Sequence, residues 1–302
     1  MTIYAIIVTY NAMRRNWIER CLKSIEASTV PMTAVIIDNG STDETRTFVP
    51  QHFPNAVWLP QEKNLGFGQA NNVGLRYALQ HEADYVLLLN QDATIGTDAV
   101  EKMLPHCDDQ TLMSPLHLNG EGTLLDIAYK YSLTFSKLNL LDDLLIRKAA
   151  APLYLAQQSP IPAACWFMPI ALIKTIGGFN PLFFHYSEDE NYLRRIQYHG
   201  LKVKICPSAV MCHDRGVHGN QKVFNKGLCQ RFVLSAATDV NLSLLKRLKE
   251  YVKILKNSYM QYLPRHQYCP GEFLMAIVWL LCHINKIRAS RNTEKSKGTN
   301  WL

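Results

Sequence analysis

Residues Ile3–Asn11 have the sequence IYAIIVTYN, in which a run rich in β-branched side chains leads directly into polar residues. Three shorter runs of the same kind follow before residue 90, separated by segments with the periodicity of amphipathic helices. Continuous apolar strands that alternate with helices are typical of a parallel sheet covered on both faces. The sequence therefore predicts an α/β fold with a doubly wound, mostly parallel sheet. The expected strands are Ile3–Thr9, Ala34–Asp38, Ala56–Leu59 and Tyr85–Leu89, and the expected helices are Trp17–Ala27, a segment starting near Thr42, Gly68–Gln80 and Asp98–His106.

Polar clusters follow each of these four strands. They are Thr9-Tyr10-Asn11, Asp38–Asp43, Asn64–Gly68 and Asn90-Gln91-Asp92. Parallel sheets bind ligands beyond the carboxyl ends of their strands, where such clusters would meet. We therefore expect a polar binding site along one edge of the sheet.

The later part of the chain is less regular. We expect an insertion over about 119–158 with some helix around Leu138–Lys148, and then further strands and one helix. The strands are expected within Pro160–Pro169, at Val203–Ile205 and at Val210–His213. A turn is expected at Ile176–Asn180. The helix is expected over Glu188–His199, with Ser187 as its N-cap and Gly200 at its C-terminal end. After about Phe232 the pattern becomes helical and basic.

Three groups of residues are candidates for metal binding or for acid–base catalysis. Asp92 follows a buried strand and can bind Mg²⁺ or Mn²⁺ together with substrate phosphates, or it can cap the next helix. His213 ends another strand and is either a satisfied structural histidine or a second ligand, which would favour Mn²⁺. Glu188-Asp189-Glu190 begin a helix, where carboxylates either complement the helix dipole or supply a general base.

The loop Gly66–Asn71 superficially matches a dinucleotide-binding fingerprint. It lacks the third glycine and follows the third strand rather than the first. An oxidoreductase that binds a dinucleotide is therefore excluded.

Taken together, these segments resemble family 2 glycosyltransferases of the GT-A fold, especially bacterial members similar to rhamnosyltransferases, over about residues 3–216. The resemblance implies a pocket for a nucleoside-diphosphate sugar. Its donor-binding residues would be Thr9, Tyr10, Asn11, Asp38, Asn64, Gly66, Asn71, Gln91 and Arg195, with Asp38 on the nucleobase and ribose.

The same resemblance implies the catalytic roles. Asp92, in a motif whose first aspartate is replaced by Asn90, and His213 would hold Mn²⁺ or Mg²⁺. Asp189 matches the general base and Glu188 lies beside it, whereas Asn191 stands where the family usually has a second aspartate.

The activity that the resemblance implies is inverting transfer of a sugar from dTDP-rhamnose or a UDP-hexose to a hydroxyl of a glycan or lipid-linked acceptor. One alternative is a nucleotidyltransferase, although the first strand is not followed by a glycine-rich, basic loop. Another is a catalytically degenerate module that binds nucleotide or glycan, which Asn90 and Asn191 keep open.

The net charge of +7 resides in the C-terminal part, where residues 241–302 hold eleven Lys and Arg against three Glu. We expect a domain over 1–230 and a basic helical extension over 231–302. Within the extension, the apolar run Phe273–Ile284 is too short to span a bilayer. It is either a buried helix or an interfacial helix on an anionic membrane. No nucleic-acid motif accompanies the charge, so nucleic acid is not an expected partner.

The cellular location follows from the N-terminus and the cysteines. The chain enters its first apolar stretch without a basic region, and its eight cysteines include no CxxC pair. We therefore expect no signal peptide, free thiols in a reducing compartment, and a cytoplasmic location that allows peripheral contact with the inner face of the membrane.

Overall fold

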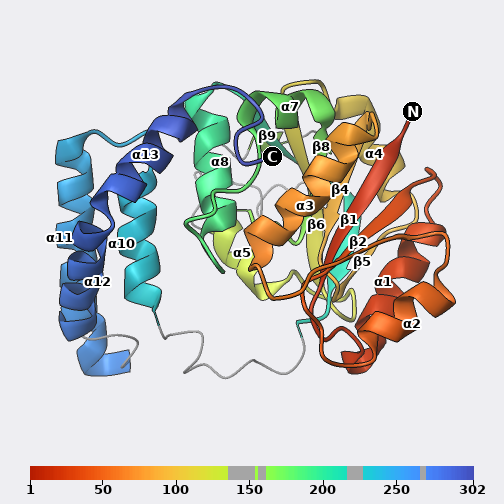
Figure 1. Cartoon of the computed structure of the whole chain (residues 1–302), viewed down its shortest axis with the longest axis horizontal. Coiled ribbons are helices and arrows are strands. Elements are labelled where there is room, and N and C mark those ends of the chain that lie inside the picture. The colour runs from red at the N-terminus through yellow and green to blue at the C-terminus, as the bar shows by residue number, and fades with distance from the viewer. Residues whose placement is uncertain (135–153, 156–160, 216–226, 266–269) are drawn as a thin grey trace.

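The computed structural model describes residues 1–134, 154–155, 161–215, 227–265 and 270–302 (Figure 1). In this part of the chain nine strands form one sheet in the order β3-β2-β1-β4-β8-β6-β9-β5, with β7 paired to β9. The strands are β1 (Ile3–Thr9), β2 (Thr33–Asp38), β3 (Val57–Pro60), β4 (Tyr85–Leu89), β5 (Ala93–Ile95), β6 (Thr111–Asn119), β7 (Tyr154–Leu155), β8 (Cys165–Pro169) and β9 (Lys202–His213).

Strand direction decides where the site lies. Strands β3, β2, β1 and β4 are parallel; β8 runs against both β4 and β6, and β6 is parallel to β9, so six strands of the described sheet point the same way. The short strands β5 and β7 oppose β9. This confirms the mostly parallel sheet. It also brings the carboxyl ends of the six strands to one rim, together with the starts of β5 and β8.

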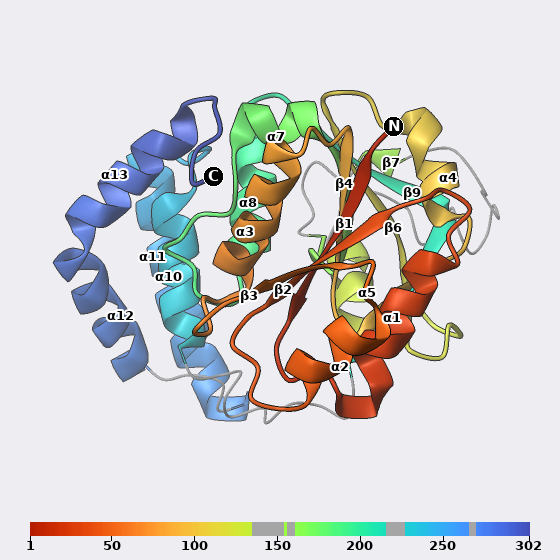
Figure 2. The ribbon, with the colours of Figure 1, turned by 45° about the vertical axis from the view of Figure 1, so that its right-hand side comes forward.

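Helices cover both faces of the sheet (Figures 1 and 2). Alternate residues of β1 show why: Ile6 belongs to the apolar core on one face, whereas Ile7 belongs to the core on the other. The Ile6 face packs against α3 (Phe67–Gln80), α5 (Ile127–Thr134), α7 (Ile170–Ile176) and α8 (Glu188–Tyr198), and the Ile7 face against α1 (Trp17–Glu26), α2 (Thr45–His52) and α4 (Ala99–Met103). A strand buried on both sides needs apolar residues at every position, which is the pattern that the sequence shows.

Several details differ from expectation. The two strands expected around Pro207 form the single strand β9, whose pairing with β6 jumps from Cys206 to Val210 at a bulge. Strand β6 itself was not expected. The helix expected at Asp98–His106 ends as α4 at Met103 and continues as a 3-10 turn that contains Pro105. The helix expected around Leu138–Lys148 lies outside the described residues.

The C-terminal extension forms a helical unit beside α8 (Figure 1). It consists of α10 (Leu228–Thr238), α11 (Leu244–Arg265), α12 (Pro270–Cys282) and α13 (Ile284–Lys295). The expected boundary at residue 231 falls inside α10, so the unit begins at or before Leu228. These helices share an apolar core that also includes Phe183, from the loop before α8.

The end of the chain returns to the sheet domain. Gly178 N–H donates to Asn300 O over 2.9 Å, and Gly298 N–H donates to Thr175 O over 2.8 Å. Glu294 of α13 is buried, and its Oε1 accepts hydrogen bonds from the amides of Asn180 (2.6 Å) and Asn191 (2.7 Å). The extension is therefore fastened to the segment that leads into α8.

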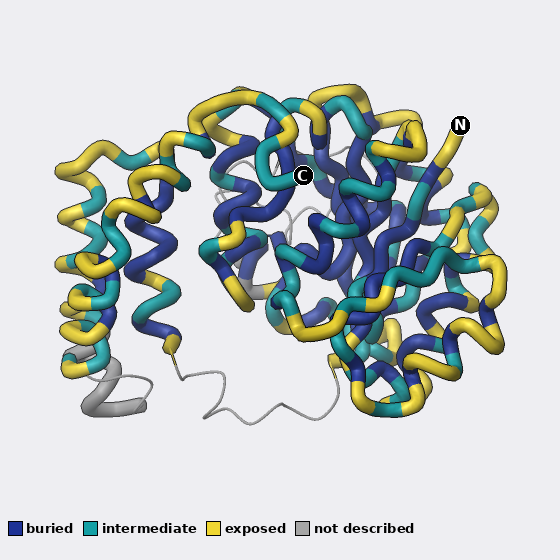
Figure 3. Tube along the Cα trace, viewed as in Figure 1, coloured by how far each residue is buried: buried dark blue, intermediate teal, exposed yellow. Residues whose placement is uncertain are grey.

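The apolar run in α12 is only partly buried. Ala276 and Leu280 are buried, whereas Leu274, Met275, Val278 and Leu281 are each more than half exposed. Figure 3 shows exposed positions alternating with less exposed ones along the helices of the extension. The buried-helix interpretation therefore holds for one side of α12. Among the described helices, none is alone long and apolar enough to cross a bilayer; α12 and α13 reach that length and composition only as a pair bent by 74°.

The contact between Glu294 and Asn191 yields a stability prediction. Asn191→Asp should place a second carboxylate against a buried Glu294, whose pKa burial already raises. We expect a loss of about 3 kcal/mol in the free energy of unfolding at neutral pH, measured by urea denaturation. Adding Glu294→Gln to Asn191→Asp should recover much of it, because the new amide can donate to the aspartate. Equal stability of the wild type and Asn191→Asp would contradict this account.

Candidate active site

The loops after β1, β2 and β4 are joined by side-chain hydrogen bonds. Gln91 accepts the N–H of Tyr10 over 2.7 Å through Oε1 and donates to its carbonyl over 3.2 Å through Nε2. Asn11 Oδ1 accepts the N–H groups of Thr42 (2.8 Å) and Asp43 (3.3 Å). Three of the polar clusters expected at one edge of the sheet therefore form one connected rim.

Within this rim, expected donor residues differ in exposure. Thr9 and Asp38 are fully buried: the Thr9 hydroxyl lies 3.5 Å from Ile37 O, and Asp38 lies 3.3 Å from Arg46 Nε. The ring of Tyr10 is 45% exposed. Of these side chains, Tyr10 is the one open to a ligand from solvent, whereas Asp38 also shapes its loop by accepting the Ser41 N–H.

The loop after β3 lies against the loop before α8. Asn64 Oδ1 accepts the Gly66 N–H over 2.8 Å, and Phe67 N–H donates to Phe184 O over 3.2 Å. Gly66 has a φ of +80°, and a Cβ there would lie 2.0 Å from Phe184 O, so only glycine fits. The loop expected to bind the donor therefore touches the loop that leads into α8 and Asp189. Asn71 lies deeper, buried in α3, with its amide bonded to Phe67 O.

Asp92 and His213 face each other across neighbouring strands. Asp92 directly precedes β5, and β5 pairs with the end of β9, where Ala93 lies opposite His213. As a result Asp92 Oδ1 is 3.2 Å from His213 Nε2, and Asp214 N–H donates to Asp92 O over 2.8 Å. A carboxylate oxygen and an imidazole nitrogen at this spacing can share one divalent cation, and the mixed donor set suits Mn²⁺.

Two residues behind His213 were missed in the sequence. Asp126 Oδ2 lies 3.7 Å from His213 Nδ1, and Arg215 donates to the Asp126 carboxylate over 2.6 and 3.1 Å. Burial alone would raise the pKa of Asp126, but hydrogen bonds from Arg215 and its charge hold that pKa below the ordinary value. An ionised Asp126 favours the tautomer with its proton on Nδ1, which leaves Nε2 free to bind a metal.

Asn90 completes the surroundings of this pair. Its Nδ2 lies 3.5 Å from His213 Nε2, while its Oδ1 is buried without a hydrogen-bond partner among the described residues. Within the same residues no group of three or more His, Cys, Asp or Glu side chains is arranged around a metal position. Asp92 and His213 are thus two protein ligands that need oxygen atoms from elsewhere.

The first turn of α8 holds two carboxyl groups with raised pKa values. Burial raises the pKa of Asp189 to about 6, and burial together with the charge of Asp189 raises the pKa of Glu188 to about 8. Glu188 is 4% exposed, so at neutral pH it is protonated while Asp189 is mainly ionised. Ser187 occupies the N-cap position with a φ of 70°, but its hydroxyl does not cap the helix; instead Asp189 accepts the Glu190 N–H.

Asp189 lies on the same rim as Asp92. The Asp189 carboxylate accepts a backbone hydrogen bond from Ala163. The next residue, Ala164, accepts the N–H of Asn90 over 2.9 Å. Because β8 runs against β4, its start meets the end of β4, and the two aspartates are separated by this short chain of contacts.

Arg195 does not lie at the rim. It is 1% exposed and donates to Ile176 O (2.8 Å) and Gly178 O (2.5 Å), with its guanidinium between the rings of Tyr192 and Trp301. These contacts correct the expectation that Arg195 binds the donor. Its role is to hold the turn before α8, which sequence alone could not reveal because Trp301 is more than 100 residues away.

Arg231 is a cation near Glu188 that was not expected. It comes from α10 in the extension and lies over the ring of Tyr186, 5.2 Å from its centre. Its charge acts on Glu188, although burial and Asp189 outweigh it. The extension therefore contributes directly to the surroundings of the carboxyl pair.

Comparison with known proteins finds similarity to enzymes that transfer sugars. A family model described as glycosyl transferase family 2 matches residues 4–137. The N-acetylglucosaminyl-diphospho-decaprenol L-rhamnosyltransferase of Mycobacterium tuberculosis is 24% identical over 220 residues, which cover 66% of this chain and 72% of the relative. The dTDP-rhamnosyl transferase RfbF of Shigella flexneri is 24% identical over 219 residues, which cover 71% and 69%.

Solved structures share the fold at low identity. The mannosyltransferase PcManGT of Pyrobaculum calidifontis, in complex with GDP-Man and Mn²⁺, is 16% identical with a TM-score of 0.57, over 97% of this chain and 83% of that one. TarS of S. aureus in complex with UDP is 17% identical with a TM-score of 0.51, over 98% and 89%. The family model and the two curated relatives favour sugar transfer over the nucleotidyltransferase alternative. Residues 4–137 thus match a glycosyl transferase family 2 domain, the sheet has the GT-A fold, and the chain is a glycosyltransferase.

Proposed function

We propose that this glycosyltransferase moves a sugar from a nucleoside diphosphate to an acceptor hydroxyl with inversion at the anomeric carbon. The observation that carries the proposal is the shared rim, where the Asp92–His213 pair and Asp189 are linked through Ala163, Ala164 and Asn90. A site for the diphosphate and a base for the acceptor are then available on one edge of the sheet.

The donor binds along the loops after β1 to β4. Tyr10 presents an exposed ring, and Thr9, Asn11, Asp38, Asn64, Gly66 and Gln91 shape the loops around it. The rhamnosyltransferase relatives favour dTDP-rhamnose as the donor, with a UDP-hexose as the alternative, and a lipid-linked glycan as the acceptor.

Asp189 acts as the general base. Its carboxylate takes the proton of the acceptor hydroxyl while that oxygen bonds to the anomeric carbon and the bond to the diphosphate breaks. A single displacement inverts the configuration and needs no nucleophile from the enzyme, unlike a retaining double displacement. Glu188, neutral at the same pH, can donate a hydrogen bond beside the base.

Mn²⁺ or Mg²⁺ is the cofactor that this donor set fits. Asp92 and His213 would hold it, with Asp126 orienting the imidazole, and the diphosphate oxygens would supply further ligands. When bound, the ion neutralises charge on the leaving diphosphate.

The base assignment predicts a specific loss. Asp189→Asn should lower kcat by about 10²–10⁴-fold, because the amide cannot accept the proton, and leave affinity for nucleoside diphosphate unchanged. In the wild type, kcat/KM should fall as the pH drops below about 6, where Asp189 takes up a proton. Glu188→Gln should keep that acid limb, since Glu188 is already neutral there. Near-normal turnover in Asp189→Asn would rule out the assignment.

The metal assignment predicts that EDTA suppresses transfer and that Mn²⁺ or Mg²⁺ restores it. Calorimetric titration of Mn²⁺ in the presence of dTDP or UDP should show binding to the wild type that His213→Ala abolishes. Asp126→Asn, which keeps the ligands but not the charge behind His213, should weaken it about 10–100-fold. Full activity in metal-free buffer would exclude this role.

We further propose that the extension contacts an anionic membrane on its outer side. Exposed apolar side chains lie on α11 at Leu245, Leu248, Val252 and Leu255 and on α12 at Leu274, Met275, Val278 and Leu281. Beside the row on α11 runs a row of exposed lysines, Lys246, Lys249, Lys253 and Lys256. An apolar row next to a basic row is typical of helices that lie in a membrane interface, and the like charge disfavours contact with a second copy.

Vesicle sedimentation tests this surface. The chain should bind phosphatidylglycerol vesicles and not neutral phosphatidylcholine vesicles, and added salt should weaken binding. Leu248→Ser combined with Val252→Ser should reduce binding at least about tenfold, because each leucine-sized group buried is worth about 1.5–3 kcal/mol. Leu124→Ser, at a leucine on the sheet domain that is at least as exposed, should have no effect. Unchanged binding by the double variant, or assembly into dimers instead, would contradict the proposal.

A further inference from the structure

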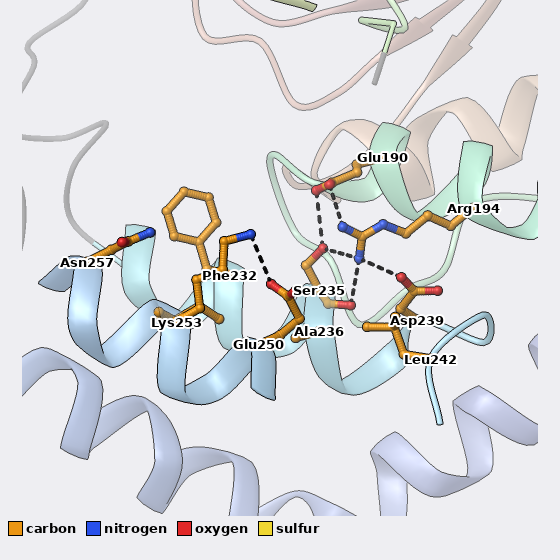
Figure 4. A pocket seen from close by; sticks show the side chains of 11 residues that line it. Glu190, Arg194, Phe232, Ser235, Ala236, Asp239, Leu242, Glu250, Lys253 and Asn257 are labelled. Carbon is orange, nitrogen blue, oxygen red and sulfur yellow. Dashed lines mark hydrogen bonds and ion pairs between the residues drawn. The ribbon is translucent and has the colours of Figure 1, made fainter. Parts of the chain in front are cut away.

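A hollow of about 500 Å³ lies between α8, α10 and α11 (Figure 4). Glu190 and Arg194 of α8 form one wall, and Phe232, Ser235, Lys253 and Asn257 of the extension contribute to the other. Its volume is within the range of pockets that bind small ligands. None of the residues assigned above to the donor, the metal or the base lines it.

The polar wall of the hollow is held in place by its own contacts. Arg194 bonds to Glu190 Oε1 (2.5 Å) and to Ser235 O and Oγ (3.0 Å each), and it lies 3.4 Å from Asp239. Ser235 Oγ donates to Glu190 Oε2 over 3.2 Å. The side chains of Glu190 and Arg194 are still 31% and 27% exposed. They therefore offer fixed acceptors and donors to a ligand without first having to be ordered.

The remaining wall is apolar and carries an aromatic ring. Phe232 is 40% exposed and lines the hollow together with Ala236 and Ile254, which are both buried. A ring beside fixed carboxylate, guanidinium and amide groups suits a ligand that has both C–H faces and hydroxyl groups. A sugar residue has this combination.

The charge of the lining argues against a phosphate group. Three carboxylates, Glu190, Asp239 and Glu250, face the two cations Arg194 and Lys253, which leaves one excess negative charge. A diphosphate would be repelled, whereas a neutral sugar would not. The ligand chemistry is therefore that of an uncharged glycan.

The position of the hollow places it on the acceptor side. Glu190 directly follows Asp189, and Arg194 lies one helical turn further along α8. The lining of the hollow therefore includes the residue next to the proposed base on the same helix. Because α10 and α11 supply seven of the eleven lining residues, the extension is needed to complete the hollow.

We propose that this hollow binds a neutral sugar residue of the acceptor, next to the sugar whose hydroxyl reacts. That the bound sugar belongs to the acceptor rests on the proposed function. Binding of a neutral sugar in the hollow can be tested without any transfer reaction. It gives the C-terminal extension a part in choosing the acceptor.

Saturation-transfer NMR on the full chain tests the proposal, with the methyl glycosides of glucose, galactose, mannose, N-acetylglucosamine and rhamnose as probes. At least one should bind the wild type in the millimolar range. Phe232→Ala and Asn257→Ala should each weaken that binding by about tenfold, as expected for the loss of one good contact. Tyr198→Ala, which removes a similarly exposed ring at the far end of α8, should bind like the wild type.

The outcomes separate this proposal from the proposed function. Asp92→Asn should lose Mn²⁺-dependent binding of nucleoside diphosphate and still bind the glycoside. If nucleotide binding does not depend on Mn²⁺ or on Asp92, the metal assignment fails, but the proposal for the hollow stands. The proposal is overturned if no glycoside binds the wild type, or if folded Phe232→Ala and Asn257→Ala both bind as tightly as the wild type does. Urea denaturation of each variant shows whether it is folded.

Discussion

Burial of the central strands on both faces is the constraint on which the rest of the structure depends. With helices packed on either side, Ile6 and Ile7 both lie in apolar cores, and backbone polar groups must pair within the sheet. The chain can then be polar only where strands end. Six strands point the same way, so their ends form one rim, and every group assigned to chemistry lies on that rim or beside it.

The antiparallel strands β5 and β8 also position residues of the site. Because β5 runs against β9, Asp92 meets His213 at the point where one strand starts and the other ends. Because β8 runs against β4, Ala163 and Ala164 connect Asp189 to Asn90. A purely parallel sheet would leave these pairs at opposite edges.

The extension is joined to the acceptor side through buried polar contacts. Glu294 accepts hydrogen bonds from Asn180 and Asn191, and Trp301 covers the guanidinium of Arg195. Asn191 stands where the family usually has an aspartate, and the contact gives this departure a structural reason: an amide can donate to Glu294, but a second carboxylate could not.

The sequence by itself determined the first four strands, most helices and the four polar clusters, because apolar periodicity and β-branched runs act over a few residues. It also indicated Asp92, His213 and Asp189 through their places at element ends. Only the tertiary structure decided that Arg195 holds a turn, that Asp126 stands behind His213, and that Glu294 pairs with Asn191. Each of these contacts joins residues far apart in the chain and depends on burial, which no local pattern records.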